Sequence, residues 1–311
     1  MTAQVEPAHD APFEIQLETR GYEIDTTATV PMAIVFRYCE HARWTMMRDP
    51  RLGIDDLVHD GHFFVVREQI FEIVRRVGQG VPLTLRTWFS SAGRSTASVV
   101  HELLRPSDGA LVAHASVTGV WIGPSRRMAR LPDTFRELAR AQAGAIPADV
   151  RTAVHDRPAS EGRAASFFDP PEVVHEVRGL DFHPPDEIDD GAVVHRHEVV
   201  VPRRELDVFS HVNAATWLTY CDDARAAAAE AGALPAAMGA LGYNVRTAIL
   251  YRHEAVVGDR LSVAVARVAD DDRALVFAIR RASEPDRTLC SIRIDTAPGA
   301  RPISEALTTA P

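Results

Sequence analysis

The chain contains one segment twice, and this repeat constrains its fold more than any other feature. Residues 23–43 align with residues 205–225 at a fixed offset of 182, without a gap. Identical residues occupy eight of the 21 aligned positions: Glu23/Glu205, Asp25/Asp207, Val30/Val212, Ala33/Ala215, Tyr38/Tyr220, Cys39/Cys221, Ala42/Ala224 and Arg43/Arg225. Such agreement at one offset predicts that the chain is built from two related structural units.

Similar patterns follow each copy of the repeat. Apolar runs rich in β-branched residues are separated by turn residues in both halves, which is typical of consecutive antiparallel strands. The expected strands are Phe63–Arg76, Leu83–Phe89, Ala97–Leu104 and Ala110–Ile122 in the first half, and Arg246–Val256, Arg260–Val268, Ala274–Ala282 and Thr288–Asp295 in the second.

Each copy also carries one helix. Asn213 is a good N-cap for an alanine-rich helix over residues 214–231, and Gly232 is a typical stop. The corresponding helix of the first half begins near Pro31, a favoured first-turn residue, and runs to about Met47. Helices this apolar need a sheet to cover them, so each half is predicted to be α+β, with a bent antiparallel sheet around one central helix. Periodicity alone leaves other α+β arrangements open.

The chain of 311 residues is long enough for two domains, each with its own core. We expect the first domain over residues 13–123 and the second over residues 193–296. Residues 124–192 are rich in proline and charge and are predicted to be a linker with a short helix at Pro132–Ala143. Residues 1–12 and 297–311 are predicted to be disordered tails.

Composition excludes several functional classes. Hydrophobic residues make up 46% and charged residues 25%, which is typical of a globular protein, and a net charge of −9 argues against nucleic-acid binding. No run of 18 apolar residues predicts a membrane span, and the amino terminus lacks a secretory signal pattern. Three cysteines show neither disulfide nor metal spacing, so we expect a cytoplasmic protein with no metal and no cofactor.

A motif at the second repeat resembles a known family signature. The segment Glu205-Leu-Asp-Val-Phe-Ser-His-Val-Asn-Ala214 resembles that of the thioesterase branch of the hotdog superfamily, which includes the 4-hydroxybenzoyl-CoA thioesterase type and the plant and bacterial acyl-ACP thioesterases. The usual form places Asp before a short loop and then Gly-His-Val-Asn-Asn; here Ser210 replaces the glycine and Ala214 the second asparagine.

A second match strengthens this resemblance. Tyr251-Arg-His-Glu-Ala255 is similar to the Tyr-Arg-Arg-Glu-Cys segment of the plant-type acyl-ACP thioesterases, which are themselves double hotdogs. The resemblance covers residues 205–263 by motif and the rest of the chain by architecture. It implies a tandem, or double, hotdog fold.

The resemblance also assigns candidate catalytic residues. Asp207 falls on the catalytic Asp of the family, His211 on the His of the plant-type site and Glu254 on its catalytic Glu. Phe209 occupies the position of the plant-type Asn, which leaves open what orients the substrate carbonyl. Asn213 lies nearby in the sequence.

These residue types suit thioester hydrolysis. The N–H groups at the start of a helix can hold a developing oxyanion, and the helix near Asn213 supplies them. Asp207, on the loop before this helix, could act as nucleophile or general base. Glu254, expected on a strand across the sheet, could be the base if Asp207 only positions, and His211 could bond the thioester or tune either acid.

Structural roles are open for the same residues. Asp207 and Asn213 could be loop or capping residues, His211 could bond the backbone and Glu254 could be a solvated strand residue. The first copy retains Asp25 but has threonine and proline where the second has histidine and asparagine. We therefore predict one working site around Asp207 and a probably degenerate one near Asp25, with the reverse assignment open.

The predicted activity is hydrolysis of an acyl thioester carried on coenzyme A or acyl carrier protein. One alternative is a hotdog dehydratase or hydratase, although its Gly-Asp-x-Asn-Pro-x-His pattern is absent; another is a non-catalytic acyl-binding protein. Docking of an acidic carrier protein would use a local basic patch, and the candidates are Arg126, Arg127, Arg130, Arg203 and Arg204. These arginines could equally be solvated loop charges, and a homodimer of double hotdogs is also compatible with the resemblance.

Overall fold

The computed structural model of the chain describes residues 8–147, 160–161, 173–174, 182–235, 238, 243–268 and 271–297. Ten strands form one antiparallel sheet in the order β1-β3-β4-β5-β2-β9-β12-β11-β10-β8. Their bounds are β1 Phe13–Glu18, β2 Phe63–Ile73, β3 Pro82–Ala92, β4 Thr96–Arg105, β5 Ala110–Ile122, β8 Val193–Val200, β9 Tyr243–Tyr251, β10 Arg260–Val268, β11 Asp271–Arg281 and β12 Glu284–Ala297. A separate pair, β6 (Ser160–Glu161) and β7 (Val173–Val174), is also antiparallel.

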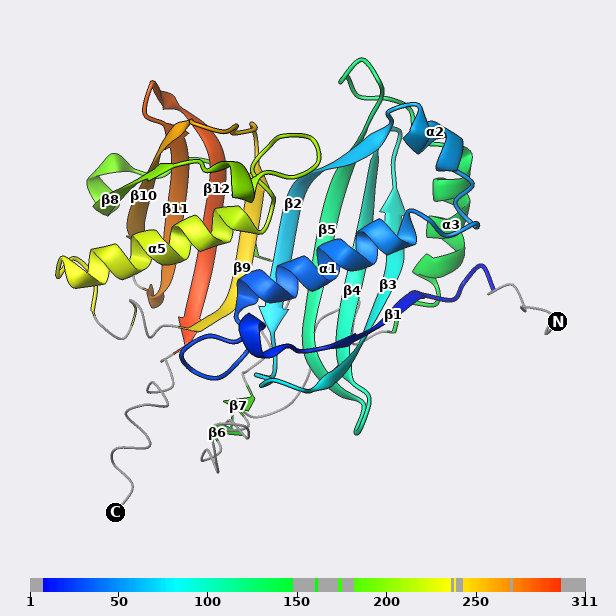
Figure 1. Ribbon diagram of the computed structural model, residues 1–311, viewed down its shortest axis with the longest axis horizontal. Coiled ribbons are helices and arrows are strands. Elements are labelled where there is room, and N and C mark those ends of the chain that lie inside the picture. Colours follow the sequence, from blue (N-terminus) through cyan, green and yellow to red (C-terminus); the bar gives the residue numbers. More distant parts are fainter. Residues whose placement is uncertain are drawn as a thin grey trace.

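The two halves meet where β2 of the first pairs with β9 of the second (Figure 1). The central helices α1 (Met32–Met46) and α5 (Thr216–Glu230) lie across the same face of the continuous sheet, one on each half. Shorter helices are α2 (Asp55–His59) and α3 (Asp133–Ala143), with 3-10 turns η1 (Gly21–Glu23), η2 (Asp190–Ala192) and η3 (Arg203–Glu205). Each half thus has the predicted α+β arrangement of one helix on a bent antiparallel sheet.

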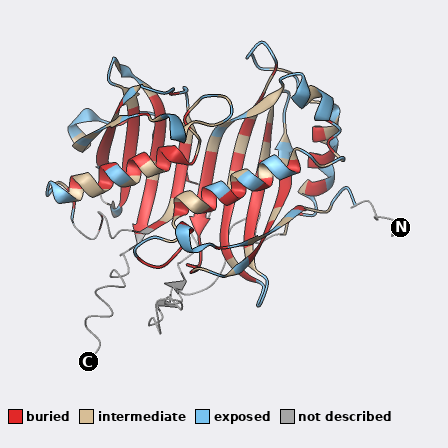
Figure 2. Ribbon diagram, in the orientation of Figure 1, coloured by how far each residue is buried: buried red, intermediate tan, exposed pale blue. Residues whose placement is uncertain are grey.

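The core lies between the helices and the sheet, where buried residues cover the strands and one side of each helix (Figure 2). On α5, Trp217, Cys221, Ala224 and Ala228 are all buried, as their helical spacing predicted. Burial of these small and aromatic side chains against the sheet supplies the hydrophobic free energy that holds each half together.

The predicted strands agree with β2–β5 and β9–β12 to within a few residues, with one consequential exception. The expected strand Arg246–Val256 ends earlier, because β9 stops at Tyr251 and the chain then leaves the sheet. Glu254 therefore lies on a loop that follows β9, and its expected place on a strand was wrong.

Packing of the first half continues beyond residue 123. Helix α3 begins after Pro132, as expected for the short helix, and Phe135 and Leu138 are buried in the same cluster as Phe89. Gln142 ties α3 to the sheet by accepting the backbone N–H of Phe89 at 2.8 Å. We therefore propose that the first unit extends through α3. Much of the predicted linker, and the predicted tail from residue 298 onward, lie outside the described residues.

Within the described ranges, no helix combines the length and the apolar character that crossing a membrane requires.

Candidate functional site

The two copies of the repeat form the same loop before their helices. The N–H of Asp207 donates to the carbonyl of His211 at 2.7 Å, and the N–H of Asp25 donates to that of Thr29 at 3.0 Å. Each loop contains one residue with a left-handed backbone, just before His211 or Thr29: Ser210 has φ of 65° and Ala28 has φ of 58°. Glycine adopts this conformation without strain, which explains why the related motif usually has glycine where Ser210 stands.

Asp207 organises the loop that leads into α5. Its Oδ1 accepts the backbone N–H groups of Phe209 at 2.8 Å and His211 at 3.1 Å, and the residue is half-buried. The loop role considered from the sequence is therefore real, but both of these bonds use the same oxygen. No hydrogen bond to Oδ2 is recorded from any residue that the structure describes.

His211 joins the second predicted acid to this loop. Its Nε2 lies 2.8 Å from Oε2 of Glu254, and its backbone N–H is the one that Asp207 accepts. Arg126 of the first half brings its Nη1 to 3.3 Å from the same ring nitrogen. The structure thus brings Asp207, His211 and Glu254 together, although they come from two separate loops.

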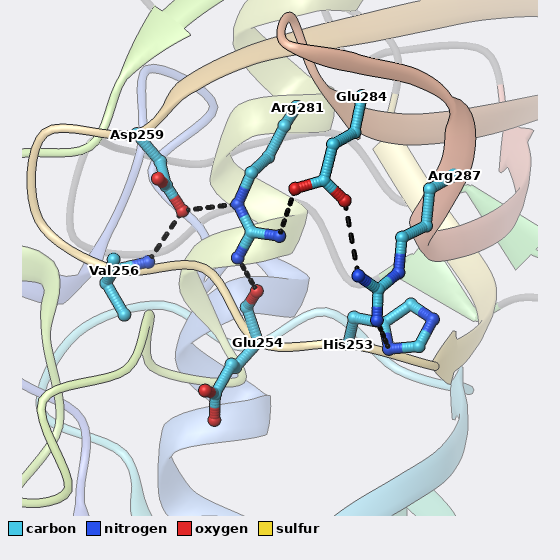
Figure 3. Close-up of polar contacts among 7 residues, drawn as sticks. All are labelled: His253, Glu254, Val256, Asp259, Arg281, Glu284 and Arg287. Atoms are coloured by element: carbon cyan, nitrogen blue, oxygen red, sulfur yellow. Dashed lines mark hydrogen bonds and ion pairs between the residues drawn. The ribbon is translucent and has the colours of Figure 1, made fainter.

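A network of arginines and acids fixes the loop that carries Glu254 (Figure 3). Arg281 donates to the backbone carbonyl of Glu254 at 2.6 Å and to Asp259 at 2.9 Å. On the other side, Arg287 bonds both Glu284 and the ring of His253. The carboxylate of Glu254 points away from these arginines in Figure 3, so its negative charge is directed to His211.

Asn213 links the two halves. Its Oδ1 accepts the N–H of Ala215 at 2.9 Å within the turn that precedes α5. The N-cap of α5 is Ala215, so the prediction of Asn213 as the N-cap was wrong by two residues. Its Nδ2 donates to both carboxylate oxygens of Glu40 on α1, at 2.9 and 3.0 Å. Asn213 thus connects Glu40 of the first half to the start of α5, and its predicted catalytic role stays a prediction.

Glu40 is the site residue that sequence reasoning missed. It is half-buried and comes from the helix of the other half. A signal was present in the repeat, because Glu40 aligns with Asp222, so that both central helices carry an acid at this position. Recognising its role required the contact across the two halves, which no spacing along the chain reveals.

Phe209 packs against two aromatic side chains of the first half. Its ring lies 4.1 Å from that of Phe63 and 6.3 Å from that of Trp44, measured between centroids, and both pairs are close to parallel. The position at which plant-type enzymes have asparagine therefore contributes aromatic packing here and no polar contact to a carbonyl.

The corresponding loop of the first half, at Asp25, makes different side-chain contacts. Oδ1 of Asp25 accepts both the N–H and the hydroxyl of Thr27, at 2.8 and 2.6 Å. Asp222, the counterpart of Glu40, accepts Nδ2 of Asn244 at 3.0 Å and pairs with Arg225 at 3.1 Å. Burial raises the pKa of Asp222, whereas the arginine opposes this rise. Asp222 is thus paired with Arg225, and Thr29 occupies the position that corresponds to His211.

Two cavities of about 320 and 420 Å³ lie elsewhere. The first is lined by residues between His183 and Ala192 and by β10, β11 and β12, and the second lies between β1 and the end of α1. None of the predicted site residues lines either cavity.

Comparison with known proteins matches the first half to a family. Residues 20–152 match the model of the thioesterase-like superfamily. Two acyl-acyl carrier protein thioesterases of Arabidopsis thaliana, ATL3 and ATL2, are 20% and 24% identical over 123 and 125 residues. These matches span 40% of this chain and 65% of each relative.

Solved structures match the whole chain. The 12:0-ACP thioesterase from Umbellularia californica superposes with a TM-score of 0.65 at 13% identity, covering 92% of this chain and 97% of that one. An acyl-ACP thioesterase from Bacteroides thetaiotaomicron gives a TM-score of 0.63 at 13% identity over 91% of this chain and 97% of that one. At this identity the match establishes the fold, and the predicted double hotdog is confirmed.

Proposed function

We propose that this chain, a double-hotdog member of the thioesterase-like superfamily, hydrolyses an acyl thioester of coenzyme A or acyl carrier protein to a free acid and a thiol. The observation that carries the proposal is a chain of contacts just before α5. The backbone N–H of His211 donates to Asp207 and the ring of His211 lies against Glu254, while Glu40 of the first half accepts the side-chain amide of Asn213, two residues further on.

The helix start supplies the oxyanion site of this proposal. Asn213 already accepts the N–H groups of Ala215, through its side chain, and of Thr216, through its carbonyl. The N–H of Ala214 has no recorded partner among the described residues, so it is the donor that we assign to the thioester oxygen. The dipole of α5, a helix of 15 residues, favours negative charge at this end.

Attack on the carbonyl carbon is assigned to the acids. In one route Asp207 or Glu254 takes a proton from water, whose oxygen then adds to the carbonyl. In the other route Asp207 itself adds, and water later hydrolyses the resulting anhydride. In both routes the C–S bond breaks, the acyl carbon gains one oxygen from water overall, and the departing thiolate takes up a proton. His211, whose ring contacts Glu254 and whose backbone N–H contacts Asp207, is the group we assign to proton transfer.

The carrier is proposed from the contacts of Arg126 and from the names of the relatives. Arg126 lies at the site and belongs to one of the two predicted basic clusters. Coenzyme A and acyl carrier protein both present a phosphate on the pantetheine arm, and an exposed guanidinium suits phosphate recognition. We propose that this cluster receives that arm.

The test is release of free thiol from matched acyl-CoA and acyl-ACP substrates, with hydration of an enoyl-CoA followed in parallel. The proposal predicts thiol release without hydration. Hydration without thiol release would replace it with the dehydratase function, and the absence of both reactions would favour a non-catalytic acyl-binding protein.

A further inference from the structure

Several side chains on the helix-covered face of the sheet bury polar atoms that have no hydrogen-bond partner among the described residues. Gln69 is 1% exposed, and within the described part of the chain neither the oxygen nor the nitrogen of its amide is hydrogen-bonded. The same is true of the hydroxyl of Thr247, at 0% exposure, and of Nε2 of His101, at 1%. Buried polar atoms without partners destabilise a fold, so a group of them indicates that something other than the protein satisfies them.

Strand alternation places Gln69 under the helices. Its neighbour Ile70 packs on the opposite face of the sheet, against Phe182. Phe71 returns to the helix-covered face, where its ring stacks on Phe36 of α1 with a centroid separation of 3.7 Å. Because successive side chains of a strand alternate between the faces, Gln69 shares the face of Phe71.

Gln69 and Thr247 occupy equivalent places at the junction of the two halves. Strands β2 and β9 pair antiparallel, with Ile70 opposite Ala248. Gln69 precedes Ile70 and Thr247 precedes Ala248, so Gln69 and Thr247 occupy symmetry-equivalent positions in the antiparallel pair of β2 and β9. Both groups therefore lie on the sheet face that the two central helices cover.

Arg43 adds a positive charge to the same region. Its repeat counterpart Arg225 donates to Asn244 at 2.6 Å and pairs with Asp222. The guanidinium of Arg43 makes no hydrogen bond with the described residues, and its Nη1 is buried. Glu40, one helical turn earlier on α1, bonds Asn213 instead.

The positive charge of Arg43 affects the pKa of two buried groups, His101 and Tyr251. Burial, and then the positive charge of Arg43, lowers the pKa of His101 on β4. Burial raises the pKa of Tyr251 on β9, and Arg43 opposes that rise. Strands β5 and β2, the second of which carries Gln69, lie between β4 and β9 in the sheet.

We propose that Gln69, Thr247, His101 and Arg43 recognise an oxygen-bearing acyl group, one with a hydroxyl, oxo or carboxyl substituent, which extends from the thioester beneath α1. The identity of this ligand as an acyl group rests on the proposed function. A plain hydrocarbon chain would leave these donors and acceptors buried without partners, and sites built to bond a polar group reject analogues that lack it.

Binding of free acids tests this inference without requiring turnover. The full chain is titrated by calorimetry with decanoate, with hydroxydecanoates substituted at successive carbons and with decanedioate, which separates a neutral oxygen from a carboxylate. Two variants remove the unpartnered groups at nearly constant shape, Gln69→Met and Thr247→Val. Thr118→Val is the matched control, because its hydroxyl bonds Ser98 on the opposite face.

At least one oxygenated acid is expected to bind about tenfold more tightly than decanoate, and each of the two variants is expected to reduce that ratio about fivefold while the affinity for decanoate stays unchanged. Thr118→Val should leave the ratio unchanged. Equal affinities for all acids, unaltered by either variant, would overturn the inference and mean that water alone satisfies these atoms. Selective acid binding in a protein that cleaves no thioester would refute the proposed function and leave this inference standing. Thioester cleavage with no selectivity among the acids would refute this inference and leave the proposed function standing.

Discussion

At the residue scale, the same types of side chain have different roles in the two copies. Asp207 and Asp25 make nearly the same loop, but only Asp207 is followed by a histidine that meets a second acid. The structure places His211 in contact with both Asp207 and Glu254, whereas the catalytic roles of these residues and the degenerate status of the Asp25 copy stay predictions. Neither the motif nor the repeat could show that Asn213 bonds Glu40, because that contact joins residues 173 positions apart.

The cysteines provide a prediction at this scale. Burial raises the pKa of Cys39 to about 12, and burial raises the pKa of Cys221 and Cys290 as well. A raised pKa keeps a thiol neutral, and therefore unreactive, at pH 8. Iodoacetamide at pH 8 should leave all three unmodified in the native protein and alkylate all three in guanidinium chloride, as measured by mass spectrometry. Fast native alkylation of Cys221 with loss of activity would contradict this and would favour a thiol nucleophile.

At the element scale, the alternating strands and apolar helices could be predicted because their periodicity reflects burial directly. The end of β9 could not, because the apolar pattern runs on through Ala255 and Val256 although the chain has left the sheet. After Tyr251 the chain is held by contacts with distant residues: Arg252 and His253 both donate their N–H groups to the carbonyl of Leu289, and Arg281 donates to the carbonyl of Glu254.

A repeated clamp between loop and helix provides a matched test. Tyr220 donates to Glu205 at 2.6 Å, and Tyr38 donates to Glu23 at 2.7 Å. Replacing either tyrosine by phenylalanine leaves a carboxylate oxygen without this donor and should cost about 1–3 kcal/mol of unfolding free energy, measured by urea denaturation. Only Tyr220→Phe should also lower thiol release, by about tenfold, because only its loop carries the proposed site. Equal activity losses in both variants would argue for two working sites.

At the scale of the whole molecule, fusion of the halves makes the proposed site composite. The sheet continues from β2 to β9, and α1 delivers Glu40 to the start of α5. The double hotdog could be predicted from the repeat, but which side chains meet across the junction depends on how the two halves pack together.

Glu40→Gln tests whether the first half takes part in catalysis. The change preserves shape but replaces one acceptor oxygen by a donor that faces Nδ2 of Asn213, which should shift the helix start that forms the proposed oxyanion site, so kcat should fall about 10–100-fold. The stability of the protein should change little, since the residue is half-buried. The matched control is Glu230→Gln, at the exposed end of α5, which should retain full activity. Full activity in Glu40→Gln would restrict the site to the second half.

The most direct test of the central claim is a comparison of Asp207→Asn with Asp25→Asn in one thiol-release assay on the full chain. Both changes keep the hydrogen bonds that order their loops possible and remove one negative charge. Asp207→Asn is expected to lower kcat by about 100–10,000-fold, with Asp25→Asn near wild type. Near-normal turnover in Asp207→Asn, together with loss in Asp25→Asn, would place the active site in the other cleft and contradict this account.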